Sequence, residues 1–251
     1  MIILLDDAAM AEFQTLCGRP DVFACRISCL YESYSVYPGL ADFWVQMIND
    51  KAAAIFARYS GTMTVYALPQ ADQQEIEAFL CMTGFRVLES NIPVLSAQRQ
   101  GVIMQLTDPR PLLPVPPGAE LCYDIPPMKQ VYELMESCRS NSFQVPAYED
   151  FVVELSHRLR HSTARCCHVQ ISGTIAAFAM TAALSRTAAL IGSVCTAVPY
   201  RRQGMGSACL MSLVSSLTAR SIFIIRAFHK NESFYHSLGF SRAGYYFSFR
   251  T

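Results

Sequence analysis

The 251-residue sequence has no net charge, because 20 lysines and arginines balance 20 aspartates and glutamates, and charged residues make up only 16% of the chain. Nucleic acids and anionic membranes attract an excess of positive charge, so we expect neither as a partner. There is no run of about 20 apolar residues, so we expect no transmembrane helix. The apolar residues 1–5 are followed at once by Asp6 and Asp7 and are too short for a secretory signal, which predicts a cytoplasmic protein.

The ten cysteines include no Cys-x-x-Cys pair and lie largely within apolar segments. Cysteine is often a small buried hydrophobic residue, and a reducing compartment permits that use, so we predict free thiols rather than a disulfide framework. No group of His, Cys and Asp has the spacing of metal ligands, and no Gly-x-Ser-x-Gly motif is present. We therefore predict no metal site and no serine nucleophile.

The most informative stretch is residues 198–207, Val-Pro-Tyr-Arg-Arg-Gln-Gly-Met-Gly-Ser. It separates a β-branched apolar segment, residues 188–198, from a segment with leucines at helical spacing. Glycines at a strand-to-helix turn leave N–H groups free, and a helix N-terminus adds positive potential, so this turn suits a phosphate. Arg201 and Arg202 add full charges for pyrophosphate oxygens. The turn alone is a weak signal, because it lacks the third glycine of a Rossmann motif and the Gly-Lys-Ser/Thr of a P-loop.

A second motif, residues 231–240, reads Asn-Glu-Ser-Phe-Tyr-His-Ser-Leu-Gly-Phe. Together the two motifs resemble the GNAT superfamily of acetyl-CoA-dependent acyltransferases, over residues about 119–251. The family's Arg/Gln-x-x-Gly-x-Gly/Ala turn falls on Arg201, Gly204 and Gly206, and its Asn and Tyr fall on Asn231 and Tyr235. The resemblance implies an α/β (α+β) fold in which a mixed, mostly antiparallel sheet is flanked by helices. It also implies acetyl-CoA as co-substrate.

The chemistry of an acyl-CoA donor assigns a role to each part of these motifs. The turn and its arginines bind the pyrophosphate, and the end of the preceding strand pairs with the pantetheine arm as an added strand would. Tyr235 donates a proton to the departing thiolate. The predicted cofactor-binding residues are Cys195, Thr196, Ala197, Val198, Arg201, Arg202, Gln203, Gly204, Met205, Gly206, Ser207, Asn231 and Tyr235.

Each assignment has a structural alternative. Tyr235 also fits a core aromatic residue, Asn231 fits a helix N-cap, and Gly239-Phe240 fits a turn and core anchor better than a site. In GNAT relatives the base is often a Glu on the strand before the glycine turn, but residues 187–198 contain no acid and no histidine. His168, Glu149 and Asp150 are the remaining and weaker candidates.

The function we expect is transfer of an acetyl group from acetyl-CoA to a primary amine of an unidentified acceptor. The chain shares the layout of the glycine N-acyltransferase-like branch, a worn first half joined to a GNAT second half, which favours a small acceptor. The alternative is an inactive CoA-binding sensor or interaction module, which the missing strand Glu supports.

The sequence predicts two domains, residues 1–110 and 111–251, with a proline-rich linker over 98–118 that includes a short strand at 102–106. In the first half we predict strands at 52–58 and 61–68 and a helix at 71–83. Residues 77–85 echo residues 233–240 as helix, Gly-Phe and strand. The first half therefore looks like a degenerate copy without the glycine turn, serving as structure or as a wall for the acceptor. Within residues 21–36, Cys25, Ile27 and Cys29 alternate, which predicts a strand.

Overall fold

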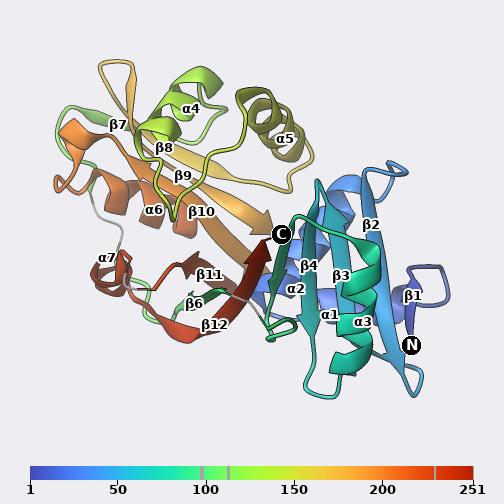
Figure 1. Cartoon of the computed structure of the whole chain (residues 1–251). Helices are drawn as coiled ribbons and strands as arrows, with labels where there is room; N and C mark the ends of the chain where they lie inside the picture. Colours follow the sequence, from blue (N-terminus) through green and yellow to red (C-terminus); the bar gives the residue numbers. More distant parts are fainter. Residues whose placement is uncertain (97–98, 112–113, 229, 251) are drawn as a thin grey trace.

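A computed structural model describes residues 1–96, 99–111, 114–228 and 230–250. Within these residues, twelve strands form one continuous sheet in the order β1-β2-β3-β4-β5-β12-β6-β11-β10-β9-β8-β7. Most neighbouring strands run antiparallel, and helices cover the sheet, as Figure 1 shows. The expected fold class is confirmed.

The first half of the chain contributes β1 (Ile2–Leu4), α1 (Met10–Cys17), α2 (Val22–Tyr34), β2 (Ala41–Ile48), β3 (Lys51–Tyr59), β4 (Thr62–Ala67), α3 (Gln73–Thr83), β5 (Val87–Ser90) and β6 (Arg99–Leu106). The second half contributes β7 (Ala119–Cys122), α4 (Met128–Ser137), α5 (Tyr148–Arg160), β8 (Cys166–Ile171), β9 (Thr174–Leu184), β10 (Ala188–Thr196), the short 3₁₀ helix η1 (Val198–Tyr200), α6 (Met205–Ser215), β11 (Ser221–Arg226), α7 (Glu232–Ser237) and β12 (Phe240–Arg250).

The two halves repeat one order of elements: a strand, two helices, three strands, a helix, and then two strands. In each half one pair of strands is parallel, β4 with β5 and β10 with β11, and a helix connects the pair. This repetition is what a duplicated unit produces. Because α3 and α6 both connect parallel strands, the counterpart of α3 is α6. The echo between residues 77–85 and 233–240 therefore pairs helices that are not equivalent, and α7 is extra to the second half.

The two halves exchange their last strands. Strand β6, from the first half, lies between β11 and β12, whereas β12 lies between β5 and β6. The segment that the sequence suggested as a linker thus begins with a full strand in the middle of the sheet. Each half lacks a complete set of strands unless the other half supplies one, and the domain boundary near residue 110 stays a prediction.

The predicted strand within residues 21–36 is wrong, because this segment forms helix α2. The Asp21 side chain caps the helix by accepting hydrogen bonds from the backbone N–H groups of Phe23 and Ala24. Helix α2 contacts β3 and β4 of its own half and β9 and β10 of the other half. It is therefore buried on most sides, which removes the polar stripe that normally reveals a helix in sequence.

Other local predictions are confirmed. Helix α3 begins after Asp72, which accepts a hydrogen bond from the Glu75 N–H, and ends at Gly84 with a φ of 67°. Phe240 is 1% exposed, and the Gly239 carbonyl accepts hydrogen bonds from the N–H groups of Thr107 and Asp108. Gly239-Phe240 therefore anchors the start of β12 against the end of β6.

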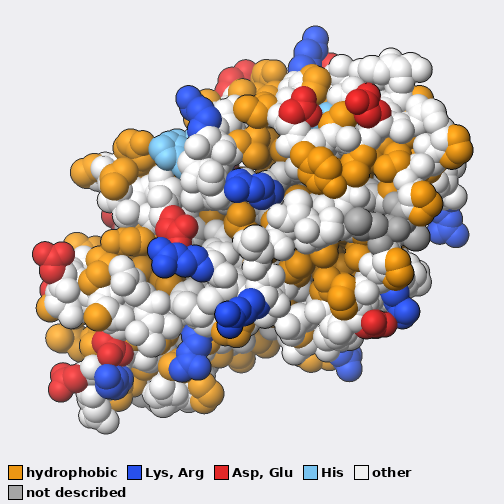
Figure 2. Space-filling model, turned by 180° about the vertical axis from the view of Figure 1, so that it is seen from behind, with side chains coloured by type: hydrophobic (Ala, Val, Ile, Leu, Met, Phe, Trp, Pro, Cys, Tyr) orange, Lys and Arg blue, Asp and Glu red, His pale blue; other side chains and the backbone are white. Residues whose placement is uncertain are grey.

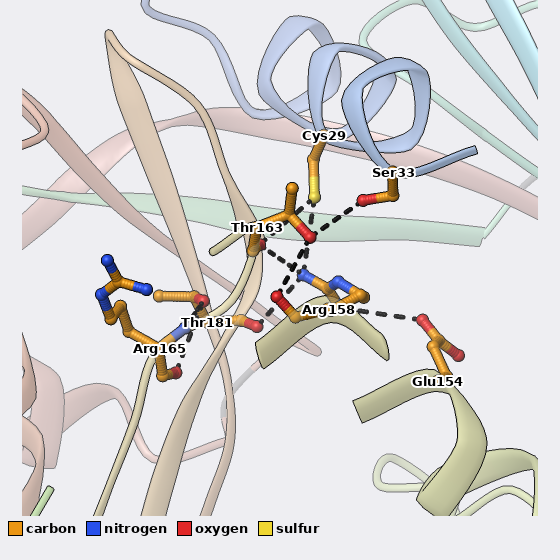
Figure 3. Close-up of polar contacts among 7 residues, drawn as sticks. All are labelled: Cys29, Ser33, Glu154, Arg158, Thr163, Arg165 and Thr181. Carbon is orange, nitrogen blue, oxygen red and sulfur yellow. Dashed lines mark hydrogen bonds and ion pairs between the residues drawn. The ribbon is translucent and has the colours of Figure 1, made fainter. Parts of the chain in front are cut away.

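Polar contacts also join the halves where α2 meets α5 and β9, as Figure 3 shows. The guanidinium of Arg158 is 5% exposed, and its Nη2 donates to the carbonyl oxygens of Thr163 at 3.2 Å and Thr181 at 3.5 Å. Ser33 of α2 donates from its hydroxyl to the Thr163 hydroxyl at 2.9 Å. These bonds satisfy buried polar atoms at the junction, which would otherwise destabilise it.

The distribution of charge on the surface and the burial of the cysteines agree with the amino-acid composition. Figure 2 shows acidic and basic side chains interspersed on one face, with uncharged areas between them. Each of the ten cysteines is a free thiol, and seven of them are buried. None of the helices within the described residues is both long and apolar enough to span a membrane.

The strand exchange predicts that residues 111–251 do not fold alone. This fragment lacks β6, so the apolar strand β11 (Ser-Ile-Phe-Ile-Ile-Arg) loses its antiparallel neighbour and becomes an exposed edge, which favours aggregation. A fragment of residues 99–251 retains β6 and is expected to be the more soluble of the two. Size-exclusion chromatography and circular dichroism of both fragments test this. A monomeric, cooperatively melting 111–251 fragment would show that β12 pairs with β11 directly and that the boundary near 110 is correct.

Candidate functional site

The candidate site is a cleft where two parallel strands diverge. Residues Ala188 to Ile191 of β10 pair with Ser221 to Ile224 of β11, and beyond them each strand pairs only with its other neighbour. A β-bulge between Gly192 and Cys195, with Ser193 at a φ of 49°, turns β10 away from β11. The opening has a volume of about 770 Å³. One edge of β10 is thereby left without a strand partner.

The glycine turn forms the mouth of this cleft, between η1 and α6. Gly204 adopts a left-handed φ of 82°, which favours glycine, and no side chain caps the helix. The first backbone bond of α6 runs from the Ala208 N–H to the Gly204 carbonyl. Among the described residues, the N–H groups of 204–207 have no acceptor. They face the cleft at the positive end of an 11-residue helix, which is a favourable place for a phosphate.

The absence of a side chain at Gly206 allows close packing of α6 against β10. A Cβ atom at this position would lie 2.6 Å from Oγ1 of Thr196, at the end of β10. The missing side chain thus lets the first turn of α6 approach the strand that borders the cleft.

The other side chains of the turn have different orientations. Arg201 is directed back to the strand, with Nε donating to the Thr196 carbonyl at 3.0 Å and Nη2 lying 3.6 Å from the Cys138 sulfur. Gln203 donates from its side chain to the Pro199 carbonyl at 2.8 Å. Arg202 is exposed and has a φ of 64°. Arg202 is therefore the arginine of this pair that is directed away from the strand end, toward solvent at the mouth of the cleft.

Tyr235 and Asn231 border the cleft from α7. Tyr235 is 8% exposed, and burial raises its pKa to about 12, with the neighbouring Cys195 adding to the rise and Arg226 opposing it. The phenol is therefore protonated at neutral pH, as a proton donor must be. Asn231 occupies the N-cap position of α7 in a left-handed conformation, but its side chain makes no capping hydrogen bond.

Comparisons with known proteins agree with this geometry. Residues 128–240 match the family model described as the acetyltransferase (GNAT) family. These residues form a GNAT acetyltransferase domain. No curated protein sequence matches the chain.

The solved structures extend the likeness to both halves. A tandem GNAT protein from the clavulanic acid biosynthesis pathway, solved without AcCoA, is 13% identical with a TM-score of 0.65, covering 100% of this chain and 98% of its own. A Drosophila protein is 11% identical with a TM-score of 0.72 and the same coverages. A GCN5-related N-acetyltransferase from Sphaerobacter thermophilus is 17% identical with a TM-score of 0.61, covering 100% and 95%. At these identities the likeness establishes the fold over the full chain, which is consistent with a duplicated unit.

The GNAT cleft contains a pair of thiols that the sequence reasoning missed as a unit. Cys138, at the end of α4, and Cys195, on β10, both line the cleft. A hydrogen bond from the Cys195 thiol, together with the Ser137 hydroxyl and Arg201, lowers the pKa of Cys138 to about 5. The same contact and burial raise the pKa of Cys195. This lowered pKa favours the thiolate form of Cys138 at neutral pH. The residues lie 57 positions apart, so no local pattern links them.

The weaker base candidates lie elsewhere. His168 is fully buried on β8, and Glu149 and Asp150 are exposed at the start of α5. None of the three borders the cleft. His168 instead approaches Cys122 and Asp124, and one potential metal-ligand atom from each lies within 4.8 Å of the others. This grouping across β7 and β8 was not visible in sequence spacing. His168 Nε2 already contacts the Gln170 amide at 2.8 Å.

The corresponding place in the first half is closed. There the last residue of β4, Ala67, gives its N–H and its carbonyl to the side chain of Asn91, at 2.8 and 2.7 Å. Asn91 follows β5 directly, so its amide bridges the ends of the parallel pair. The end of β10 has an unpaired edge in the GNAT domain. The equivalent end of β4 in the first half is already hydrogen-bonded.

The contact between Gly206 and Thr196 predicts the effect of a small substitution. Gly206→Ala should weaken acetyl-CoA binding, because relieving the 2.6 Å contact moves the turn at a cost of roughly 1–3 kcal/mol. In the double variant Gly206→Ala/Thr196→Ala the oxygen is gone, and affinity should return. Titration calorimetry of the single and double variants measures this. If the single and the double variant lose the same acetyl-CoA affinity, the added methyl group contacts the ligand and not Thr196.

The pKa of Cys138 predicts its reactivity. Iodoacetamide should alkylate Cys138 at nearly the same rate at pH 6 as at pH 8, because a thiol with a pKa of about 5 is ionised at both. A thiol of ordinary pKa slows about tenfold per unit below its pKa. Peptide mass spectrometry compares Cys138 with the exposed Cys81, and CoA should protect Cys138 alone. If both thiols slow in parallel as the pH falls, Cys138 is not a thiolate.

Proposed function

We propose that the chain is an N-acetyltransferase that moves the acetyl group of acetyl-CoA to the primary amine of a small acceptor. The observation that carries this proposal is the divergence of β10 and β11, which opens a cleft of about 770 Å³ with the uncapped turn of α6 at its mouth. The free N–H groups at the mouth orient a long thioester that carries a pyrophosphate at one end.

The features of the cleft assign a place to each part of the acetyl-CoA molecule. The pyrophosphate lies on the N–H groups of 204–207, with Arg202 nearby in solvent. The amides of the pantetheine arm pair with the partner-free edge of β10 at residues 192–196, as an added strand would. This direction carries the thioester inward, toward the place where Tyr235 and Cys195 approach each other.

The reaction follows from these positions. The neutral amine of the acceptor attacks the thioester carbonyl carbon, the C–S bond breaks, and an amide forms. The Tyr235 hydroxyl donates its proton to the departing CoA sulfur, and the proton that the amine loses returns to the phenolate through water. Holding donor and acceptor in one cleft supplies much of the rate, because it removes the entropy cost of bringing them together.

One observation favours the alternative of a CoA-binding sensor. Among the described residues that line the cleft there is no aspartate, glutamate or histidine, so no ordinary base faces the acceptor. A sensor binds acetyl-CoA but releases no CoA with any amine. The two functions therefore separate in a turnover assay, and binding alone does not distinguish them.

Tyr235→Phe tests the catalytic assignment. Removing only the hydroxyl keeps the packing of the ring, and loss of a general acid typically costs about 100- to 10,000-fold in rate. We expect kcat to fall within that range while acetyl-CoA affinity holds, because the pyrophosphate contacts lie at the other end. With its pKa raised to about 12, Tyr235 stays protonated, so wild-type kcat should not decline below about pH 11 through this group.

Chromatographic detection of CoA release measures turnover in this test, and calorimetry measures binding. The stoichiometry should be one acetyl-CoA per chain, because Asn91 occupies the equivalent strand end in the first half. An unchanged kcat together with a lower melting temperature would make Tyr235 a packing residue. Binding without CoA release for every amine tried would favour the sensor.

A further inference from the structure

A second cavity lies at the junction of the two halves, beside the cleft. It has a volume of about 300 Å³, and its walls come from α2 and β3–β4 of the first half and from α5 and β9 of the second. Ala182 of β9 lines this cavity, whereas Gly192 of β10 lines the cleft. A Cβ atom on Gly192 would lie 2.9 Å from the Cβ of Ala182. The lining of the cavity and the lining of the cleft are therefore in contact at this pair of residues, on neighbouring strands.

Two arginines give the cavity its chemistry. Arg158 from α5 is 5% exposed, and among the described residues no acceptor is found for its Nε. Arg26 from α2 also lines the cavity and forms an ion pair with Glu89 of β5. A buried guanidinium N–H without an acceptor is uncommon and costly, unless a ligand satisfies it.

The acidic partners of these arginines do not cancel their effect inside the cavity. Glu154 also lines the cavity and lies 3.7 Å from Arg158, but its side chain is 44% exposed, so water screens its charge. Glu89 forms an ion pair with Arg26 and does not line the cavity. Figure 3 shows Glu154 on the side of the Arg158 guanidinium away from Thr163 and Thr181.

The cavity also offers polar groups suited to an oxyanion. The ring of Tyr34 stacks on that of Tyr59 at 4.5 Å, and both line the cavity. The Tyr34 hydroxyl is buried and meets the Tyr59 hydroxyl, but no well-directed hydrogen bond joins them. A phenol O–H and two guanidinium groups around one small space match a carboxylate, which accepts several charge-assisted hydrogen bonds.

We propose that this junction cavity is the acceptor site and that it selects small primary amines that carry a carboxylate. Arg26 and Arg158 hold the carboxylate, and the amine points past Ala182 toward Gly192 and the thioester. This assignment rests on the proposed acetyl transfer in the cleft, but the binding of a carboxylate here is testable without turnover. It gives the first half a function, because Arg26, Tyr34 and Tyr59 all come from it.

Matched ligands that differ only by a carboxylate test the proposal. Glycine, serine and phenylalanine are compared with methylamine, ethanolamine and phenethylamine by calorimetry on the full chain saturated with CoA. We expect at least one acid to bind, and each acid that binds to do so about 10- to 100-fold more tightly than its decarboxylated partner, as a charge-assisted contact provides. If no acid binds better than its amine, the proposal is overturned.

Variants locate the binding. Arg26→Gln should remove the preference for the acid, and Arg165→Gln, an exposed arginine outside the cavity, should leave it unchanged. Glu89→Gln should raise affinity severalfold, because Arg26 loses its competing carboxylate. The double variant Arg26→Gln/Glu89→Gln leaves no unpaired buried charge, so loss of binding there cannot arise from misfolding caused by an orphaned Glu89. Retained preference in that double variant overturns the assignment.

Turnover with the same ligands separates this proposal from the proposed function. Carboxylate-dependent binding that disappears with Arg26→Gln, without CoA release, upholds the cavity assignment and refutes acetyl transfer. Rapid acetylation of an amine and its carboxylated partner at equal kcat/KM upholds acetyl transfer and refutes the cavity assignment.

Discussion

The exchange of the last strands is the constraint on which the rest of this structure depends. Because β6 lies between β11 and β12, and β12 between β5 and β6, the hydrogen bonds of each half's sheet are completed by the other. An unpaired apolar edge is costly and prone to aggregation, so the exchange holds the halves in a fixed relation. That fixed relation also brings α2 of the first half against β9 and β10 of the second. The walls of the junction cavity depend on this relation, because they come from both halves, whereas the residues that line the GNAT cleft all come from the second half.

The cleft itself comes from a second, local constraint. Parallel pairing of β10 and β11 stops after Ile191 and Ile224, where the bulge at 192–195 turns β10 away. The first half contains the same parallel pair, but the Asn91 side chain joins its ends. The two halves therefore contain equivalent strand ends, and the amide group of Asn91 closes the one in the first half. The closed half is free to serve as a wall, and it contributes Arg26 and two tyrosines to the lining of the junction cavity.

Buried charge distinguishes the interior of this protein from an ordinary core. Arg158 and Arg26 lie at the junction, and the thiolate form of Cys138 is favoured by Cys195, Ser137 and Arg201. Each of these groups is costly to remove from water and needs a partner. Carbonyl oxygens and ion pairs satisfy most of this need. Among the buried atoms without a hydrogen-bond partner, Arg158 Nε and the Tyr34 hydroxyl belong to residues that line the junction cavity, which is where the chain has capacity to bind another molecule.

The GNAT domain, the glycine turn and most local elements could be predicted from the sequence, because these depend on residues within one or two turns of each other. Asp72, Gly84 and the Gly204 turn act through their own backbone neighbourhood. The strand exchange, the helical state of residues 22–34, the Cys138–Cys195 pair and the junction cavity became visible only in the folded chain. All four depend on contacts between residues that are distant in the sequence. Burial and pairing across distant strands fix these features, and a helix buried on most sides carries no periodic signal. Thiols 57 positions apart, or arginines from two halves, meet only after the sheet has closed.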